Sequence, residues 1–178
     1  MCDTTILVWG RMNPPTKGHE LLVSHARELG EQLSGEVKIF LSHTHDKKTN
    51  PLKYDDKIAA AQLAFGDVVM SSPCKTIMQV LKSIGAKNLV MVCGSDRLEE
   101  FNALLNKYNN IEYNFDSIEV VSGGERDPDG DELSAMSASA LRQKVLKHDY
   151  QGFKSGLPTG LYYEAQHLYQ LILEALDE

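Results

Sequence analysis

The amino-acid sequence predicts a doubly wound α/β fold, in which helices cover both faces of a parallel sheet of five strands. Two observations lead to this prediction. Short, unbroken apolar runs recur along the chain, and such runs are typical of strands that are buried on both faces. Amphipathic stretches of helical length separate the runs, and this alternation favours a parallel, doubly wound sheet. In that architecture, ligands bind beyond the carboxyl ends of the strands.

The predicted elements follow one another in a regular order. Strands are predicted at the apolar runs, which occupy residues 6–9, 37–41, 68–70, 89–93 and 118–121. The helices between them are predicted at about 18–33, 55–65, 74–85 and 96–108. In the second of these helices, apolar residues recur at close to helical spacing, at Ile58, Ala61, Leu63 and Phe65.

The tail of the chain is predicted to form one more helix, over about 160–177. Tyr162 and Tyr163 are expected to help pack it. Its inward-facing residues are expected to be Leu161, Ala165, Leu168, Leu171, Ile172 and Leu176. No internal repeat and no Pro- or Gly-rich linker is found, so we predict a single domain over residues 1–178 that ends in a C-terminal helix.

Composition and charge narrow the class of function. The formal net charge of −7 argues against a broad nucleic-acid surface, although a local cluster of cations can still bind a small anion. No apolar run approaches the ~20 residues that a membrane-spanning helix needs, and no secretory signal is found. Cys2, Cys74 and Cys93 lack the spacing of a zinc site or of a disulfide framework. We therefore expect a cytoplasmic protein without nucleic-acid or membrane partners.

The segment 10–19 lies between the first predicted strand and the first predicted helix. Gly10 is expected to let the chain turn sharply, and Thr16 is expected to be the N-cap, which puts His19 in the first helical turn. Lys17 and a charged His19 would oppose the helix dipole there, unless an anion joins them. This arrangement indicates a phosphate site, while a turn-and-cap segment with incidental charges explains the same residues equally well.

A similar arrangement recurs at residues 136–142, before another amphipathic stretch. Ser139 is expected to be the N-cap, and Arg142 follows it three residues later, as His19 follows Thr16. The planar donor fork of an arginine suits two phosphate oxygens at once. Two such helix starts could hold a triphosphate between them, whereas an ordinary structural cap is the alternative interpretation for Ser137.

These segments resemble the two signatures of the nucleotidylyltransferase superfamily. Residues 10–19 are similar to its GxFxPxHxGH signature and residues 136–142 to its ISSTxIR signature, in the same order and with similar spacing. Two departures are Thr16, in place of the first histidine, as in the pantetheine-phosphate branch, and Ala138, where a serine is frequent. The paired signatures are specific to the superfamily and much less specific to the substrate.

Further segments point to a branch of the superfamily. Residues 94–96 (Gly-Ser-Asp) resemble the GxD element of nicotinamide-mononucleotide adenylyltransferases, and residues 50–52 (Asn-Pro-Leu) resemble an Asn-Pro-Phe segment of one branch of that group. Over residues 5–158 the chain looks most like small nucleotidyltransferases that tailed bacteriophages encode.

The resemblance implies a Rossmann-like fold and direct transfer of AMP from ATP to a phosphate-bearing acceptor, with nicotinamide mononucleotide as the best guess and pyrophosphate as the leaving group. No protein nucleophile is needed, and Mg²⁺ is expected to accompany the triphosphate without a dedicated protein ligand. Two alternatives stay open: a cytidylyltransferase that acts on a sugar- or alcohol-phosphate, and a non-catalytic nucleotide-binding sensor.

The resemblance also implies roles for residues. His19 would donate to an α-phosphate oxygen with Thr16 assisting, and Arg142 and Ser139 would hold the β- and γ-phosphates. Asp96 would accept from a ribose hydroxyl, although a cap for the following helix is an equal alternative. The nucleotide-binding set is Gly10, Arg11, Met12, Lys17, Gly18, Gly94, Asp96, Ser137 and Ser139. Further phosphate candidates are Arg126, in the loop 123–132 that is expected to be a mobile flap, and Lys47 and Lys48.

Overall fold

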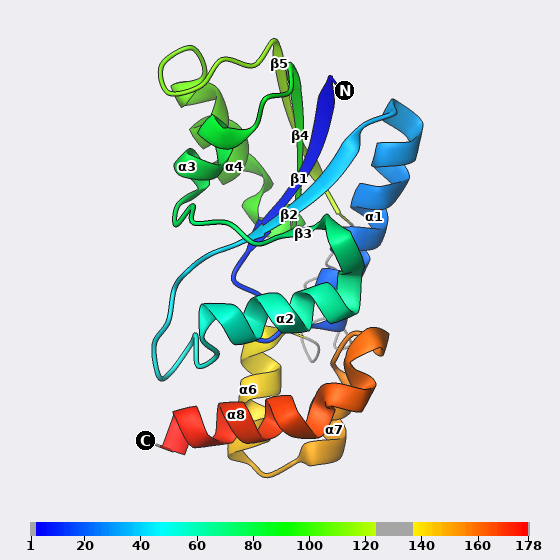
Figure 1. The fold of residues 1–178 in the computed structure, drawn as a ribbon, viewed down its shortest axis with the longest axis vertical. Helices are drawn as coiled ribbons and strands as arrows, with labels where there is room; N and C mark the ends of the chain where they lie inside the picture. The colour runs from blue at the N-terminus through cyan, green and yellow to red at the C-terminus, as the bar shows by residue number, and fades with distance from the viewer. Residues whose placement is uncertain (1–2, 124–136, 178) are drawn as a thin grey trace. The chain divides into compact units, whose positions relative to one another are not determined.

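A computed structural model describes residues 3–123 and 137–177 and confirms the α/β fold with a five-stranded parallel sheet (Figure 1). The strand order is β3-β2-β1-β4-β5. The strands are β1 (Thr4–Gly10), β2 (Glu36–Leu41), β3 (Val69–Met70), β4 (Asn88–Cys93) and β5 (Ser117–Ser122). All five coincide with the predicted apolar runs, and the central strands β1 and β4 are the most deeply buried.

Seven α-helices occur among the described residues. They are α1 (Lys17–Leu33), α2 (Tyr54–Phe65), α3 (Ile77–Ser83), α4 (Leu98–Tyr108), α6 (Ala138–Leu146), α7 (Tyr150–Ser155) and α8 (Ala165–Asp177). Three short 3₁₀ helices accompany them: η1 (Gly66–Val68), η2 (Ser95–Arg97) and η3 (Thr159–Glu164). No helix in the described ranges is both long and apolar enough to cross a membrane.

The fold divides into two compact units that alternate along the chain. The first takes the described residues within Met1–Gly10, Leu21–Ser42 and Met70–Arg126, and the second takes those within Arg11–Glu20, His43–Val69 and Asp127–Glu178. The single domain over residues 1–178 stays a prediction.

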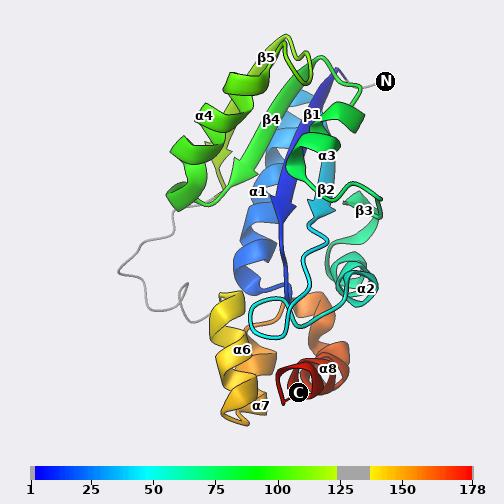
Figure 2. The ribbon, with the colours of Figure 1, turned by 90° about the vertical axis from the view of Figure 1, so that its left-hand side faces the viewer.

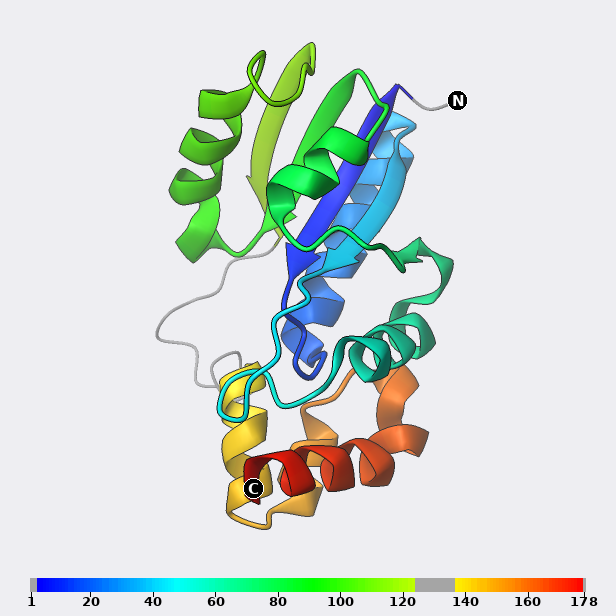
Figure 3. The same cartoon turned by 60° about the vertical axis from the view of Figure 1, so that its left-hand side comes forward.

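The first unit is a three-layer sandwich around the sheet. Helices α3 and α4 cover one face, as Figure 3 shows, and α1 covers the other. Leu7 and Met91 of the sheet pack in one fully buried cluster with Val80 of α3 and Leu105 of α4. On the α1 side, Gly30 approaches the sheet closely, because an added Cβ would lie 3.0 Å from Val37. The register sets Val8 beside Val92, so the carboxyl ends of β1 and β4 meet at one edge.

The second unit has a core of its own, built from α2, α6, α7, η3 and α8. Leu141 and Val145 of α6, Phe153 of α7 and Ile172 of α8 are fully buried in one cluster, and Leu52 joins them from the loop before α2. Figure 2 shows α6, α7 and α8 grouped together. Leu141 of this core lies in the first turns of α6, at the helix start that the second signature predicts.

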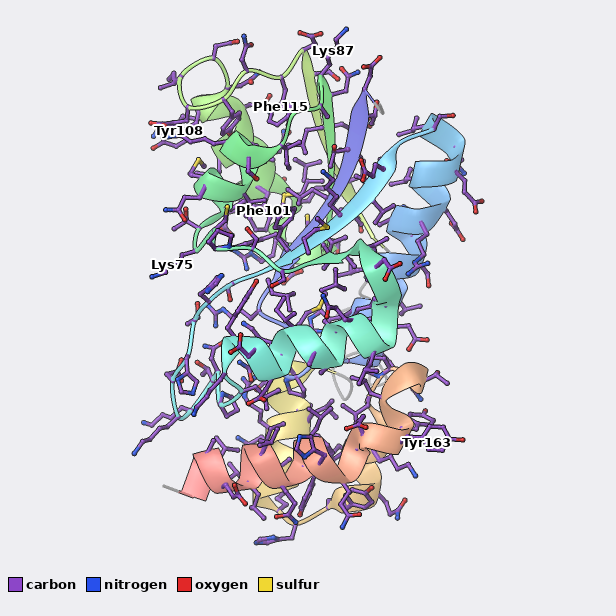
Figure 4. All side chains as sticks on the ribbon, in the orientation of Figure 1. Lys75, Lys87, Phe101, Tyr108, Phe115 and Tyr163 are labelled. Atoms are coloured by element: carbon purple, nitrogen blue, oxygen red, sulfur yellow. The ribbon has the colours of Figure 1, made fainter. Side chains whose placement is uncertain are left out.

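Several expectations about the helices need correction. The tail is not one helix, because η3 precedes α8. Of its predicted inward residues, Leu171 and Leu176 are only half-buried. Tyr163 is fully exposed and points away from the protein (Figure 4), so it does not pack the helix. In α2, Leu63 is 59% exposed, since the buried face of that helix passes through Lys57 and Ala61 instead.

Candidate active site

The first turn of α1 carries the predicted Thr16–His19 pair. Thr16 is buried and caps the helix: its Oγ1 accepts from the backbone N–H of His19 at 3.3 Å. In return, the backbone N–H of Thr16 donates to Nδ1 of the His19 ring at 3.0 Å. The pattern is a capping box in which histidine takes the place of the usual Glu or Gln. The predicted N-cap is therefore confirmed.

These bonds fix the state of the His19 ring. A backbone N–H can only donate, so Nδ1 of His19 must be an acceptor without a proton. In the neutral ring the proton then belongs to Nε2, which becomes the donor nitrogen. The turn thus orients the imidazole and selects the tautomer that can donate a hydrogen bond from its outer nitrogen.

Lys17 and Gly18, two further residues that were predicted to bind the nucleotide, lie in the first turn of α1 beside His19. Lys17 donates its backbone N–H to the Gly156 carbonyl at 2.9 Å, and its ammonium lies 5.4 Å from the centre of the Tyr162 ring. In the described part of the chain, no acceptor is found for the backbone N–H of Gly18. A helix start with an open N–H group attracts anions.

The turn that precedes α1 is made at an unexpected residue. β1 ends at Gly10, but the left-handed backbone conformation belongs to Met12, with φ of 43°. The Met12 side chain is 1% exposed. Its packing holds a conformation that a non-glycine residue otherwise avoids. The expectation that Gly10 makes the turn is therefore wrong.

Asn13 connects three segments that lie far apart in the sequence. Its side-chain amide donates to the Leu52 carbonyl at 3.0 Å, and its Oδ1 accepts from the Leu52 N–H at 2.8 Å. Its own backbone carbonyl accepts from Nη1 of Arg142 at 3.0 Å. The structure thus brings the two signatures into direct contact. Sequence reasoning missed this role, because pairing over such separations leaves no local pattern.

The start of α6 differs from the prediction by two residues. The N-cap is Ser137, with ψ of 157° and its Oγ accepting from the Ala140 N–H at 3.1 Å. Ser139 lies within the first turn, so its predicted capping role is wrong. Local sequence suits either serine as a cap, and the extended backbone at Ser137 decides between them. Both serines stay candidates for phosphate contact.

Arg142 is half-buried, and its charge is strongly influenced by its surroundings. Burial lowers the pKa of its guanidinium, Asp46 raises it, and the neighbouring Arg11 lowers it. The group keeps its charge, because arginine stays protonated in proteins. Arg142 is therefore a cation that one bond to Asn13 holds in place, with further donors on its planar fork.

Lys57 is a candidate site residue that sequence reasoning missed. It is fully buried on α2, and burial, followed by the charge of Arg11, lowers the pKa of its ammonium to about 8. Arg11 therefore interacts with both Lys57 and Arg142, and we call these three residues the cation cluster. One signal was present in the sequence: a lysine stands in the apolar stripe that passes through Ala61 and Phe65. The usual expectation that lysine is exposed concealed it.

We expect Lys57→Met to raise the free energy of unfolding at pH 7 by about 1–3 kcal/mol, because the fold no longer buries an ammonium. The folded-state pKa of Lys57 is about 8 and the ordinary value is 10.5, so the unfolded chain holds this proton more tightly. Wild-type stability should therefore rise between these two pH values. Urea unfolding across this range measures the effect, with Lys53→Met as an exposed control. Equal pH dependence in wild type and Lys57→Met would contradict the assignment.

The loop before α2 is ordered by Asp46. Its carboxylate accepts from the backbone N–H of Lys48 at 3.0 Å and of Thr49 at 2.7 Å, and from the side-chain amide of Asn50 at 2.8 Å. These bonds, that of Asn50 first, hold the pKa of Asp46 far below its usual range. Lys48 and Lys47 are exposed on this loop. Their side chains add positive charge to the second unit, and their contact with phosphate stays a prediction.

Histidines of the same loop do not form a metal site. His43 stacks on the Tyr54 ring, with ring centres 3.7 Å apart. Within residues 3–123 and 137–177, no group of three His, Cys, Asp or Glu side chains could hold a metal ion.

The remaining candidates belong to the first unit. Gly10 is the last residue of β1, and Gly94 directly follows the adjacent strand β4 at the same edge of the sheet. Asp96 is exposed in η2, and neither η2 nor α4 has a side-chain cap, so the cap alternative for Asp96 is wrong. Arg126 and most of the loop 123–132 lie outside the described residues.

Taken together, the second unit presents a cation cluster, an oriented imidazole and an open helix start. These groups suit a polyanion such as a triphosphate, since each of them stabilises negative charge. The oriented His19 ring and the fixed Arg142 guanidinium favour chemistry by positioning and charge stabilisation.

Comparisons with known proteins identify a family and a similar fold. A family model for cytidylyltransferase-like proteins matches residues 7–144, a range that contains both signatures. Among solved structures, the chain is similar to TmcAL of Thermotoga maritima, crystallised with alpha-thio ATP, with a TM-score of 0.52 and 10% identity. The match covers 98% of this chain and 56% of that chain, so this chain spans little more than half the length of that protein. No curated protein matches the sequence.

Proposed function

The chain belongs to the cytidylyltransferase-like family, and on this premise we propose that it is a nucleotidyltransferase that transfers AMP from ATP to a phosphate-bearing acceptor. The observation that carries this proposal is the bond from Arg142 to the Asn13 carbonyl, which joins the two signatures. The alpha-thio ATP bound to the structurally similar TmcAL supports ATP as the donor.

In the proposed reaction, an oxygen of the acceptor phosphate attacks the α-phosphorus in line, the bond to the β-phosphate oxygen breaks, and pyrophosphate leaves. His19 donates from Nε2 to an α-phosphate oxygen, and Thr16 keeps Nδ1 in the acceptor state. Arg142, with Ser137 or Ser139, holds the β- and γ-phosphates. The backbone N–H of Gly18 adds a fixed donor at the helix start, so charge is stabilised by groups that need no reorganisation.

Mg²⁺ is proposed as the partner of the triphosphate. It binds phosphate oxygens and keeps several waters, so few protein ligands are needed. When bound, it neutralises charge on the departing pyrophosphate. Mg²⁺ would be held by the triphosphate, and the chain's own cations Arg142 and Arg11 would hold the remaining phosphate charge.

The acceptor is proposed to be nicotinamide mononucleotide. Support comes from the resemblance of residues 94–96 and 50–52 to segments of its adenylyltransferases. In the structure, the second of these segments includes Leu52, which pairs with Asn13 and so lies beside the first signature. The cation cluster has three members, and of these only Arg142 is proposed to bind the β- and γ-phosphates of ATP. We propose that Arg11, the exposed member of the cluster, faces the phosphate of the acceptor, while the fully buried Lys57 contributes only its charge.

The test is pyrophosphate release with Mg²⁺, crossing ATP and CTP against phosphorylated acceptors that include nicotinamide mononucleotide, glycerol 3-phosphate and sugar 1-phosphates. We expect release with ATP and nicotinamide mononucleotide only. Release with CTP and an alcohol- or sugar-phosphate would replace the proposal by the cytidylyltransferase alternative. Nucleotide binding by calorimetry, without release for any pair, would favour a sensor.

A further inference from the structure

A segment near the C-terminal end of the chain holds the first turn of α1. This segment comprises residues 156–162. Its Gly156 carbonyl accepts from the backbone N–H of Lys17 at 2.9 Å. Its Thr159 N–H donates to the carboxylate of Glu20 at 3.1 Å. Both bonds span most of the chain length, and both end within one helical turn of the histidine that the reaction uses.

A third contact comes from the side chain of Lys17, whose ammonium lies 5.4 Å from the centre of the Tyr162 ring, within cation–π range. The lysine of the first signature is thereby held against residues 156–162. Residues 156–162 therefore contact the first turn of α1 at three points: the Gly156 carbonyl, the Thr159 N–H and the Tyr162 ring.

The holding segment is itself rigid. Leu157 and Leu161 are fully buried in the core of the second unit, together with Leu141 of α6. Gly156 packs so closely on Leu141 that an added Cβ would collide with its side chain. Leu141 directly precedes Arg142. One segment is therefore fixed against both the turn that carries His19 and the helix that carries Arg142.

We propose that Glu20 is a positioning residue, which orients the His19 ring by tying the first turn of α1 to the Thr159 N–H. The expected effect on kcat rests on the transfer reaction proposed above. Glu20 is half-buried and adjacent in sequence to His19, but its carboxylate is occupied by residue 159 rather than directed at a substrate. It acts through His19, because the ring orientation depends on where the first turn sits.

The contact is separable from the fold. Without the Glu20 carboxylate, the Thr16 cap and the Lys17 bond to Gly156 still hold the helix start. The turn then gains freedom to move by a fraction of an ångström, and misplacement by about 1 Å can cost about 10²-fold in rate. We expect Glu20→Ala to lower kcat about tenfold and to change KM for ATP less than about twofold.

The decisive experiment is a double-mutant cycle on pyrophosphate release. It compares Glu20→Ala, His19→Ala and the double variant, with Glu31→Ala as an exposed control on the same helix. We expect Glu20→Ala to have no further effect once His19 is removed, and we expect Glu20→Gln to recover most of kcat, since its amide oxygen still accepts. Additive losses, or the same loss in Glu31→Ala, would overturn the proposal.

A second readout needs no turnover, so failure of the proposed function and failure of this inference can be distinguished. Nitrogen-15 NMR of the imidazoles reports which ring nitrogen carries the proton. The wild-type His19 ring should show an unprotonated Nδ1 and a protonated Nε2, and Glu20→Ala should shift the His19 ring resonances without changing the tautomer, because the Thr16 N–H bond to Nδ1 is retained. An unchanged His19 spectrum in Glu20→Ala would reject the positioning role, even if the reaction proves to be a different one.

Discussion

His19→Ala is expected to lower kcat for pyrophosphate release by about 10²–10³-fold, as removal of a transition-state donor does in comparable electrostatic sites. The Nε2–H of His19 is directed by the bond that Nδ1 accepts from Thr16, so the effect should appear in kcat. KM for ATP should change little, because the donated bond strengthens only as charge develops on the α-phosphate. Steady-state kinetics with the active pair from the substrate panel measure both constants.

Two controls separate chemistry from the fold. His19→Gln keeps an acceptor for the Thr16 N–H, so it should retain the thermal stability of the wild type and still lose activity. His167→Ala removes an exposed imidazole on α8 and should leave both properties unchanged. Near-normal turnover in His19→Gln would remove His19 from the mechanism.

Arg142→Ala is expected to lower kcat/KM for ATP by about 10–100-fold, mainly through KM. The guanidinium has a charge-assisted donor fork, and one arm is already fixed on the Asn13 carbonyl. Loss of this bond also leaves a buried carbonyl without its donor and loosens the contact between the signatures, at a cost of about 1 kcal/mol in stability. Kinetics as a function of ATP concentration, with calorimetric ATP binding, test the prediction.

The matched variants are Arg142→Lys and Lys147→Ala. Lysine keeps the charge but not the planar fork, so Arg142→Lys should recover only part of the lost affinity. Lys147 is an exposed cation at the C-terminal end of the same helix, and its removal should have little effect on KM. Wild-type ATP affinity in Arg142→Ala would show that the triphosphate lies elsewhere.

Much of the fold could be predicted from sequence because burial on two faces leaves a strong local pattern. The run 89–93 is an example: it becomes β4, and every residue in it is buried. The Thr16 cap could also be predicted, since a hydroxyl before a helical stretch has few other uses. Predictions of this kind depend only on neighbours in the chain.

The parts of the site that escaped prediction depend on distant or ambiguous residues. Asn13 pairs with Leu52, 39 positions away, and nothing near either residue indicates the other. The cap of α6 fell on Ser137 rather than Ser139, because two serines fit the pattern and the backbone selects one. Lys57 is buried against the usual behaviour of lysine, and a buried charge of this kind is itself typical of functional sites.

The reciprocal bonds between Thr16 and His19 lead to an expectation about which residue relatives of this chain carry at the position of His19. A helix start is served best by Glu or Gln at the position of His19, since both reach back to the N-cap N–H. In a relative that binds nucleotides without turnover, no selection for catalysis would maintain the imidazole. Selection for helix stability would then favour Glu or Gln at this position. Among relatives of this chain, a histidine at that position should accompany turnover, and a glutamate or glutamine should mark its loss.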